Sequence, residues 1–560
     1  MAIPVNHEAV PGNTTLVDLD GHIKSRHAQG GQADIVLIPT PSDDPDDPLN
    51  WTMKRKYLSV FCTVVYVYAI GVPSAAIYSV LSNVSAETGL TLTELNRGTG
   101  YMFLFLGLGC AFFQPIALQW GKRPVYLFST LATCAVSVWA PYTKSNSEWI
   151  GSKILQGFFG SPVESLSEIS ISDIFFEHER ATALGVYGIA LTTSNYMASV
   201  ISGFITQGMG WQWVMWWCAV FDGACFLFLF FFMEETNYNR HLNTDKLEVV
   251  DGIAIHSNNG EVPAMGDEEQ KIDYVVNESS EHSDVENTSE SIPTDNNKKK
   301  TTTKTFLQRL SITSGRIERF ILPHLVVGMF KMAQFPSVLW AGFINGSSLV
   351  WFNLLNGTAS KILSAEPYNF SASARGLSYL SPVICALIFY FFAAPMSDKI
   401  KIWFARRRGG LSFAEDRLWI LTIRMVLGLL ASIGWGVGAY YGVHWFILVL
   451  SMGVLGGSGI FSSITSITYC TDCYYDMSTE AMVIVIVIRN CMSYACSYGL
   501  TEWVNNLGLK HAFINSGFAL FGSMGTFIVM RYTGPWWRNK LKHKYWRIVE
   551  DMRAKRGSLH

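Results

Sequence analysis

Twelve long apolar runs constrain the fold of this chain more than any other feature of its sequence. A helix needs about 20 mostly apolar residues to cross the hydrocarbon core of a bilayer. Windows of that length cover residues 57–81, 95–118, 125–142, 149–172, 182–207 and 213–233, and then 325–354, 374–396, 418–441, 443–469, 481–504 and 512–532. Charged residues make up 15% of the chain, whereas a soluble domain carries about 25%. The sequence therefore predicts an all-α membrane protein with twelve transmembrane helices in two six-helix bundles.

The polar segments around these runs predict the domain boundaries. We expect an N-terminal tail at 1–50, a first bundle at 51–235, a polar linker at 236–322, a second bundle at 323–534 and a C-terminal tail at 535–560. The linker and the N-terminal tail combine low hydrophobicity with clustered charge, a composition that favours disorder. Lys and Arg gather in the loops on the side of both termini, and the positive-inside bias then places both ends in the cytoplasm.

Composition and motifs argue against catalysis and nucleic-acid binding. The net charge of −2 leaves no basic footprint for a nucleic acid. The sequence has neither a phosphate-binding Walker loop nor a His-Glu-x-x-His motif. Cys470 and Cys473 form a C-x-x-C pair, but no second ligand pair stands near it. We expect no cofactor, no metal and no enzymatic activity, and a monomer whose partners are lipid, protons and a small molecule.

The two halves repeat their polar features at matching loops. Asp173 follows the fourth apolar run and Asp472 follows the tenth, and Glu-Arg-Ala at 179–181 corresponds to Thr-Glu-Ala at 479–481. A duplicated six-helix unit suits transport by alternating access, in which one bundle rocks against the other around a central site.

Several stretches carry a family resemblance. They are Asp-Asp-Pro-Leu-Asn-Trp at 46–51, the loop at 114–123, the segment 157–164 with its continuation to residue 180, and Glu-Asp-Arg-Leu-Trp at 415–419. With these stretches the chain resembles the fungal major facilitator superfamily, in its drug:proton-antiporter-1-like branch. Within that branch the acid-rich fourth run is most similar to the yeast histidinol and polyamine cation permeases. The resemblance implies a proton-coupled secondary transporter of the plasma membrane.

The resemblance also implies a cytoplasmic gate made of inter-bundle salt bridges. The residues concerned are Lys122, Arg123, Asp173, Arg180, Asp398, Asp472 and Glu480. The family pattern is broken in two places. Gln119 and Trp120 occupy the position of an expected Asp-Arg pair, and the fifth run lacks the Gly-Pro motif of antiporters, which favours uptake over export.

Glu164 and Glu168 are the strongest candidates for chemistry within the membrane. Charged groups are costly at bilayer depth, so each one is a functional candidate. The two carboxylates lie four residues apart and share one face of a helix. Both cannot stay ionised cheaply in a low dielectric, so the pair is expected to bind protons and an organic cation. The alternative is that both acids form structural bridges with neighbouring basic residues.

Further candidates surround this pair. Arg489 and Arg424 are its basic counterparts, and we expect Arg489 to neutralise an acid and the pocket to be net acidic. Asn345 is expected to face the cavity, because an amide facing lipid would go unpaired. The resemblance places four aromatic side chains on cavity-lining helices, where ring faces can hold ammonium groups; they are Tyr66, Trp351, Phe461 and Tyr469.

These residues predict proton-coupled transport of small organic cations, with polyamine uptake by symport as the first reading. Two alternatives stay open. One is an antiporter that exports cationic or amphipathic compounds in exchange for protons, and the other is a transporter-like sensor that binds a nutrient without moving it.

Overall fold

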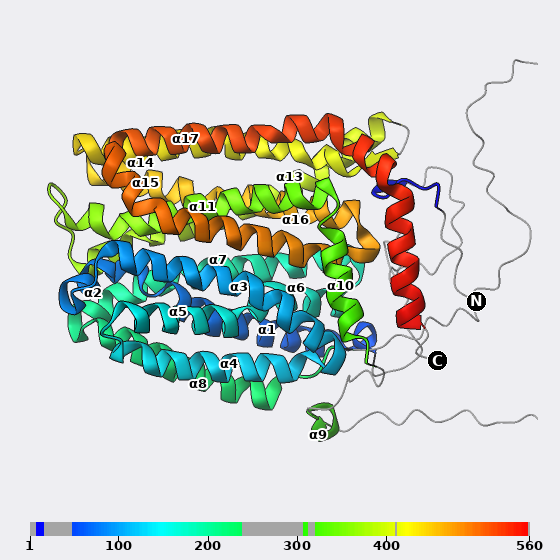
Figure 1. Ribbon diagram of the computed structural model, residues 1–560, viewed down its shortest axis with the longest axis horizontal. Helices are drawn as coiled ribbons and strands as arrows, with labels where there is room; N and C mark the ends of the chain where they lie inside the picture. Colours follow the sequence, from blue (N-terminus) through cyan, green and yellow to red (C-terminus); the bar gives the residue numbers. More distant parts are fainter. Residues whose placement is uncertain (1–6, 16–46, 238–305, 312–319, 409–410, 558–560) are drawn as a thin grey trace, which may run out of the picture. The chain divides into compact units, whose positions relative to one another are not determined.

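The computed structural model describes residues 7–15, 47–237, 306–311, 320–408 and 411–557, which all belong to one compact unit. Its helices run alongside one another in two groups (Figure 1). The first group contains α1 (Met53–Ala75), α2 (Leu81–Thr88), α3 (Leu92–Trp120), α4 (Lys122–Trp139), α5 (Asn146–Gly160), α6 (Pro162–Ile174), α7 (Glu177–Met209) and α8 (Trp211–Phe232), with short 3-10 turns at Pro48–Asn50, Tyr78–Val80 and Ala140–Tyr142.

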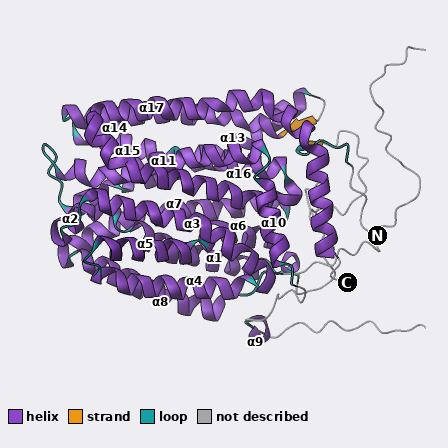
Figure 2. Ribbon diagram, in the orientation of Figure 1, coloured by secondary structure: helices purple, strands orange, loops and turns teal. Residues whose placement is uncertain are grey.

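The second group follows the short helix α9 (Phe306–Arg309). It contains α10 (Leu322–Met332), α11 (Pro336–Ser364), α12 (Ala372–Ser378), α13 (Leu380–Arg407), α14 (Leu421–Tyr441), α15 (Trp445–Gly457), α16 (Gly459–Cys473) and α17 (Ser478–Gly557), with 3-10 helices at Ala414–Ile420 (η5) and Tyr475–Met477. Helix dominates the described chain (Figure 2). The prediction of an all-helical membrane fold is confirmed in its main feature.

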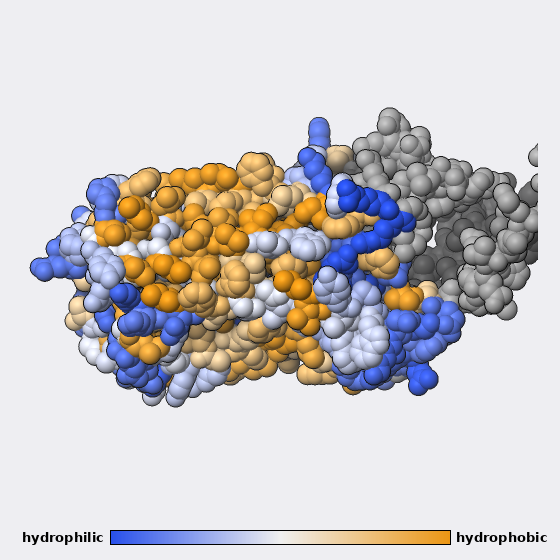
Figure 3. Space-filling model, turned by 90° about the horizontal axis from the view of Figure 1, so that it is seen from above, coloured by the Kyte–Doolittle hydropathy of each residue, from blue (hydrophilic) through white to orange (hydrophobic). Residues whose placement is uncertain are grey.

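Nine helical segments among the described residues are long and apolar enough to cross a membrane. Long apolar side chains such as Phe391 and Leu430 are exposed on their outer faces. Figure 3 shows a belt of apolar residues across the visible face, with hydrophilic residues at both ends. The number twelve stays a prediction, because it also requires α7, the α5–α6 pair and two crossings by α17. That last helix is interrupted at Gly508, whose φ of 73° lies in the left-handed region that favours glycine.

Several spans that we predicted as continuous are broken in the structure, and three of the breaks lie at Pro162, before Pro336 and at Ser458. Proline has no N–H and restricts the residue before it. Pro162 therefore separates α5 from α6, and Pro336 separates α10 from α11. The span at 443–469 breaks at Ser458, between α15 and α16. Two of these breaks occupy matching positions in the two halves, after the first part of the fourth and tenth spans, and both adjoin the cavity described below.

The described N-terminal residues are docked against the second bundle. Strand β1 (Asn13–Thr15) pairs antiparallel with β2 (Leu411–Phe413), with Asn13 opposite Phe413. The predicted disorder of the N-terminal tail is therefore wrong for this segment, because backbone pairing and the buried side chain of Arg538 hold it. The predicted C-terminal tail is helical up to Gly557 and buries Tyr545 and Val549. Most of the predicted linker lies outside the described residues.

Candidate functional site

A cavity of about 350 Å³ lies between the two bundles. Helices α1, α3, α6 and α7 line it from the first bundle, and α11, α13, α14, α15, α16 and α17 line it from the second. Its polar lining consists of Glu164, Glu168, Thr192, Asn195, Asn345, Ser348, Arg417, Arg424, Ser463, Thr468 and Arg489, among others. A site at the interface of two repeated bundles is where alternating-access transporters hold their cargo.

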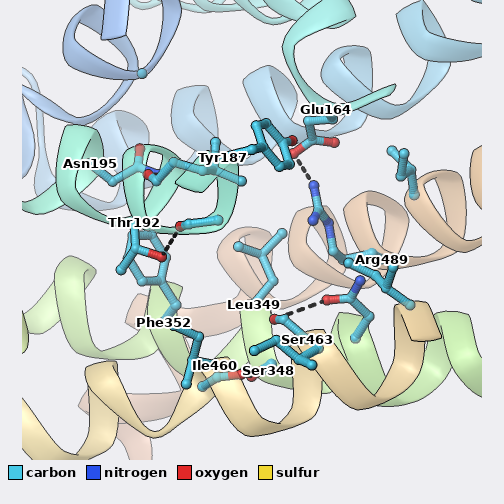
Figure 4. A pocket seen from close by; sticks show the side chains of 18 of the residues that line it. Glu164, Tyr187, Thr192, Asn195, Ser348, Leu349, Phe352, Ile460, Ser463 and Arg489 are labelled. Atoms are coloured by element: carbon cyan, nitrogen blue, oxygen red, sulfur yellow. Dashed lines mark hydrogen bonds and ion pairs between the residues drawn. The ribbon is translucent and has the colours of Figure 1, made fainter. Parts of the chain in front are cut away.

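An ion pair joins the two bundles inside this cavity. Arg489 of α17 donates from Nη2 to Oε1 of Glu164, which lies in the first turn of α6 (Figure 4). The amide of Asn490 donates to Oε2 of the same carboxylate over 2.8 Å. The Glu164 side chain is 9% exposed and that of Arg489 is 14% exposed. The expectation that Arg489 neutralises an acid is confirmed, and the acid is the first of the two candidate glutamates.

Close packing brings α3 against α17 beside this ion pair. A Cβ atom on Gly107 of α3 would lie 2.8 Å from Cβ of Asn490, so only glycine lets α3 approach α17 so closely. The break before α6 also stabilises the negative charge of Glu164, because it places this residue in the first turn of a helix, and a helix N-terminus favours a negative charge.

Glu168 lies one turn further along α6 and lines the same cavity. Its main-chain oxygen accepts from Ser172 Oγ over 2.9 Å. Within the part of the chain that the structure describes, no side chain pairs with its carboxylate. The two acids that the sequence placed on one face thus differ: Glu164 is held by a cation, whereas Glu168 offers a charge to the cavity.

The charges around the cavity correct one expectation. We predicted a net-acidic pocket, but the described lining holds three arginines and two glutamates, so that prediction is wrong. Arg417 pairs through Nε with Asp472 over 2.9 Å, and Arg489 pairs with Glu164. The basic residues come from η5, α14 and α17, which helix packing brings to one place and sequence spacing does not reveal.

Polar groups on α7, α11 and α16 complete the lining. Ser463 Oγ lies 3.5 Å from Oδ1 of Asn345, the one predicted amide that lines the cavity (Figure 4). Ser348 Oγ lies 2.7 Å from Ser462 Oγ. On α7, Asn195 donates to the Leu191 carbonyl over 2.9 Å and turns toward the cavity.

Residues on α7 were missed by the sequence analysis. Tyr187, Thr192, Asn195 and Tyr196 all line the cavity. Leu184, Tyr187, Thr192 and Asn195 follow one another at intervals of three to five residues along the fifth apolar run, which keeps them near one face of a helix. This periodicity of polar groups within an apolar run was the signal available in the sequence.

The four predicted aromatic ligands do not line the cavity. Each is part of the packing within a bundle, which fills space that the sequence could not show to be closed. Tyr66 is fully buried, with its hydroxyl 2.7 Å from Ser129 Oγ. Trp351 donates to Ser347 Oγ over 3.1 Å. Phe461 packs against Phe389, and the Tyr469 hydroxyl donates to Glu415 over 3.4 Å.

The predicted gate residues form ion pairs within each bundle. Lys122 pairs with Asp173 in the first bundle. In the second, Asp472 accepts a hydrogen bond from Lys401 Nζ over 2.9 Å and forms an ion pair with Arg417. The sequence led us to expect bridges between bundles, whereas these pairs join helices of the same bundle.

The remaining gate residues behave differently. Arg123 donates over 2.7 Å to the Phe230 carbonyl and also to that of Leu310. Glu480 is buried at the start of α17. The side chains of Arg180 and Asp398 lie outside the described set. Gln119, at a position where the family pattern has a charged pair, accepts from the backbone N–H of Ile321 over 2.9 Å and so links the bundles.

Aromatic rings close the cavity at the end away from the described chain termini. Phe352 of α11 lies between Tyr78 and Tyr196 of the first bundle, with ring centroids 6.0 and 5.6 Å away. Beyond them, Arg97 pairs with Glu502 over 2.6 Å, and Arg375 donates to Asn83 over 2.6 Å. Each of these contacts joins one bundle to the other.

Two helical bundles around a central cavity, with an ion pair between them at its wall, are the architecture of a membrane transporter. A family model described as Major Facilitator Superfamily matches residues 59–474. The chain belongs to that superfamily.

Similarity to individual proteins agrees with this assignment. The uncharacterized MFS-type transporter C1271.10c of Schizosaccharomyces pombe is 27% identical, with 97% of this chain and 95% of that protein covered. Protein HOL1 of Saccharomyces cerevisiae is 25% identical over 91% of each chain, and the MFS antiporter QDR3 of Candida albicans is 20% identical over 89% of this chain and 80% of its own. The partially occluded inward-open xylose transporter XylE of E. coli has the same fold, with a TM-score of 0.56 at 11% identity over 85% of this chain and 98% of its own.

Proposed function

We propose that this protein is a proton-coupled secondary transporter of small organic cations that works by alternating access in the plasma membrane, as a monomer with both termini in the cytoplasm. The observation that carries this proposal is the pairing of two different acids on one face of α6. Glu168 offers an uncompensated carboxylate to the cavity, and Glu164 holds Arg489 across the bundle interface.

The geometry suggests how a proton and a cation are coupled. An ammonium group that enters the cavity gains a charge-assisted hydrogen bond at Glu168. A proton on Glu164 removes the charge that binds Arg489, so the contact between α6 and α17 weakens and the bundles are free to move. Because a ligand shifts a conformational equilibrium only by its differential affinity for the two states, the proton and the cargo act on the same rearrangement.

The proposal includes three readings, which differ in the direction of transport and in the cargo. Uptake of polyamines by symport is the first reading of the sequence, and the missing Gly-Pro motif in the fifth span favours it. Export in exchange for protons is the second, and one fungal relative is described as an antiporter. A sensor that binds cargo without moving it is the third.

The test is uptake of a panel of labelled alkylammonium compounds, spermidine among them, into transport-deficient yeast at several external pH values. Accumulation that depends on this chain and collapses with a protonophore supports symport, reduced accumulation supports export, and binding without flux supports a sensor. Glu164→Gln is expected to abolish transport while surface expression is retained. Full activity of that variant would falsify the role given to this carboxylate.

A further inference from the structure

Arg424 is a buried cation that the proposed mechanism does not use. It lies on α14, is 1% exposed and lines the cavity. Its Nη1 donates to the Leu455 carbonyl over 2.8 Å and to the hydroxyl of Ser458. Its Nε is buried and has no hydrogen-bond partner among the residues that the structure describes. No carboxylate in that part of the chain pairs with it.

A guanidinium in this position is costly unless something compensates it. A buried charge without a counter-charge is strongly unfavourable, and an unsatisfied buried donor adds to the cost. The other two arginines of the cavity each have a carboxylate, namely Asp472 for Arg417 and Glu164 for Arg489. Arg424 is therefore the one cavity arginine, within the described chain, whose counter-charge is missing.

The second uncompensated group of the cavity is the Glu168 carboxylate, on the other bundle. One wall of the site thus presents a free negative charge and the other a free positive charge. A ligand with a charge of each sign would satisfy both, whereas a diamine would bring its second ammonium toward a guanidinium. Arginine is also the side chain whose planar donors best match a carboxylate.

We propose that Arg424 binds the carboxylate of the cargo, so that this transporter prefers dipolar amines, which carry one ammonium and one carboxylate, over diamines. The ammonium lies at Glu168 and the carboxylate at Arg424. This inference rests on the proposed function, because it keeps the ammonium group at Glu168 and the coupling to protons. It changes the preferred cargo from polyamines to ammonium compounds that also carry a carboxylate.

The experiment uses the full-length protein in proteoliposomes with an imposed pH gradient. The probes are matched sets of four and six carbons: 1,4-diaminobutane, 4-aminobutyrate and butylamine, and 1,6-diaminohexane, 6-aminohexanoate and hexylamine. The variants are Arg424→Gln, which removes the charge, and Arg424→Lys, which keeps it. Thermal unfolding of each purified variant shows whether it is folded.

We expect the wild-type protein to take up the amino acid of at least one set in preference to its diamine. Since a hydrogen bond to a charged group is worth enough to change binding tenfold or more, Arg424→Gln should lower the ratio of amino-acid to diamine uptake by about tenfold. Arg424→Lys should retain most of it. Butylamine has no group to place at Arg424, so its uptake by each protein is the reference against which the two other compounds of the set are compared.

Two results would overturn the inference while leaving the proposed function intact. One is proton-driven uptake in which diamines outrank amino acids in the wild-type protein. The other is a ratio that Arg424→Gln leaves unchanged, which would assign Arg424 to holding the break between α15 and α16 through Leu455 and Ser458. If no amine of either set moves with the proton gradient, the proposed function itself fails, and the inference fails with it.

Discussion

Arg489 and Glu164 form an ion pair that crosses from one six-helix bundle to the other at the wall of the central cavity. The two residues are 325 positions apart in the chain and meet because α6 and α17 face each other across the bundle interface. A contact that couples proton binding to transport must differ in strength between the conformational states of the transporter. The ion pair meets this condition, because it is weakened when Glu164 takes up a proton.

Removing Arg489 alone should destabilise the protein, because Glu164 then keeps a buried charge that lacks its guanidinium. We expect Arg489→Gln to lower the free energy of unfolding by about 3–5 kcal/mol, and the double variant Glu164→Gln/Arg489→Gln to recover most of this loss without recovering proton-driven uptake. Thermal unfolding in detergent measures the first effect and proteoliposome flux the second.

Arg97→Gln is the control for that comparison. It also breaks an inter-bundle ion pair, but one whose side chains are 31% and 60% exposed, and such surface pairs contribute about 0–1 kcal/mol. If the double variant were no more stable than Arg489→Gln, the unpaired charge of Glu164 would not be the reason for the loss of stability.

Glu168→Gln should weaken cargo binding without weakening the fold. The carboxylate has no partner among the described side chains, so the substitution breaks no internal bond. Loss of a charge-assisted hydrogen bond to an ammonium predicts an increase in Kd of about 10- to 100-fold. Binding of labelled amine to the purified protein checks this, with the exposed Glu502→Gln as a control. Unchanged affinity would remove Glu168 from the binding site.

Phe352→Ala should open the cavity from the end away from the chain termini, because the ring fills the gap between Tyr78 and Tyr196. The measurement is labelling of Ser348→Cys by a membrane-impermeant thiol reagent applied from that side. We expect labelling to rise several-fold. Since Cys491 is exposed, the parent without the added cysteine is measured alongside.

Phe391→Ala provides the matched control for the ring deletion. Phe391 is 71% exposed on the outer surface and does not line the cavity. Labelling that rises equally in both variants would mean that loss of any ring loosens the protein, and the closing role of Phe352 would be wrong.

Glu415→Gln should release the docked N-terminal segment. The side chains of Glu415 and Arg538 are fully buried against each other, and Arg538 also donates to the Pro11 carbonyl and to Asn13. We expect a loss of about 3–5 kcal/mol in unfolding free energy and faster amide hydrogen exchange in residues 7–15. Lys542→Gln, which breaks the exposed pair with Glu8, should change neither much. Slow exchange of residues 7–15 in Glu415→Gln would contradict the anchoring role of this pair.

The sequence predicted the elements of this protein better than their contacts. The apolar runs placed most helices to within a few residues, since the length of a span is set by the bilayer and each run records it locally. Helices α11, α13 and α17 extend well beyond the runs that predicted them, because a helix can continue past the apolar segment. It also identified Glu164, Glu168 and Asn345, because a carboxylate or amide inside an apolar run is conspicuous by itself. The breaks at Pro162 and Pro336 could also have been predicted, because proline interrupts a helix, but we predicted continuous spans there.

The sequence could not predict the surroundings of the four aromatic residues Tyr66, Trp351, Phe461 and Tyr469. An aromatic residue in an apolar helix gives no sign of whether it faces cavity, lipid or a neighbouring helix, and all four turned out to fill the interior of a bundle. The same limit explains the missed stripe on α7, whose side chains are ordinary until a second bundle faces them.

The sequence by itself determined that this chain spans a membrane, that its two halves repeat and that acids lie within an apolar run, because hydropathy, periodicity and charge are properties of each segment alone. Only the tertiary structure decided which acid is neutralised and which is free, and that the cavity carries Arg424 opposite Glu168. Those outcomes depend on which helix faces come together, and helices far apart in the chain meet through packing that no local pattern encodes.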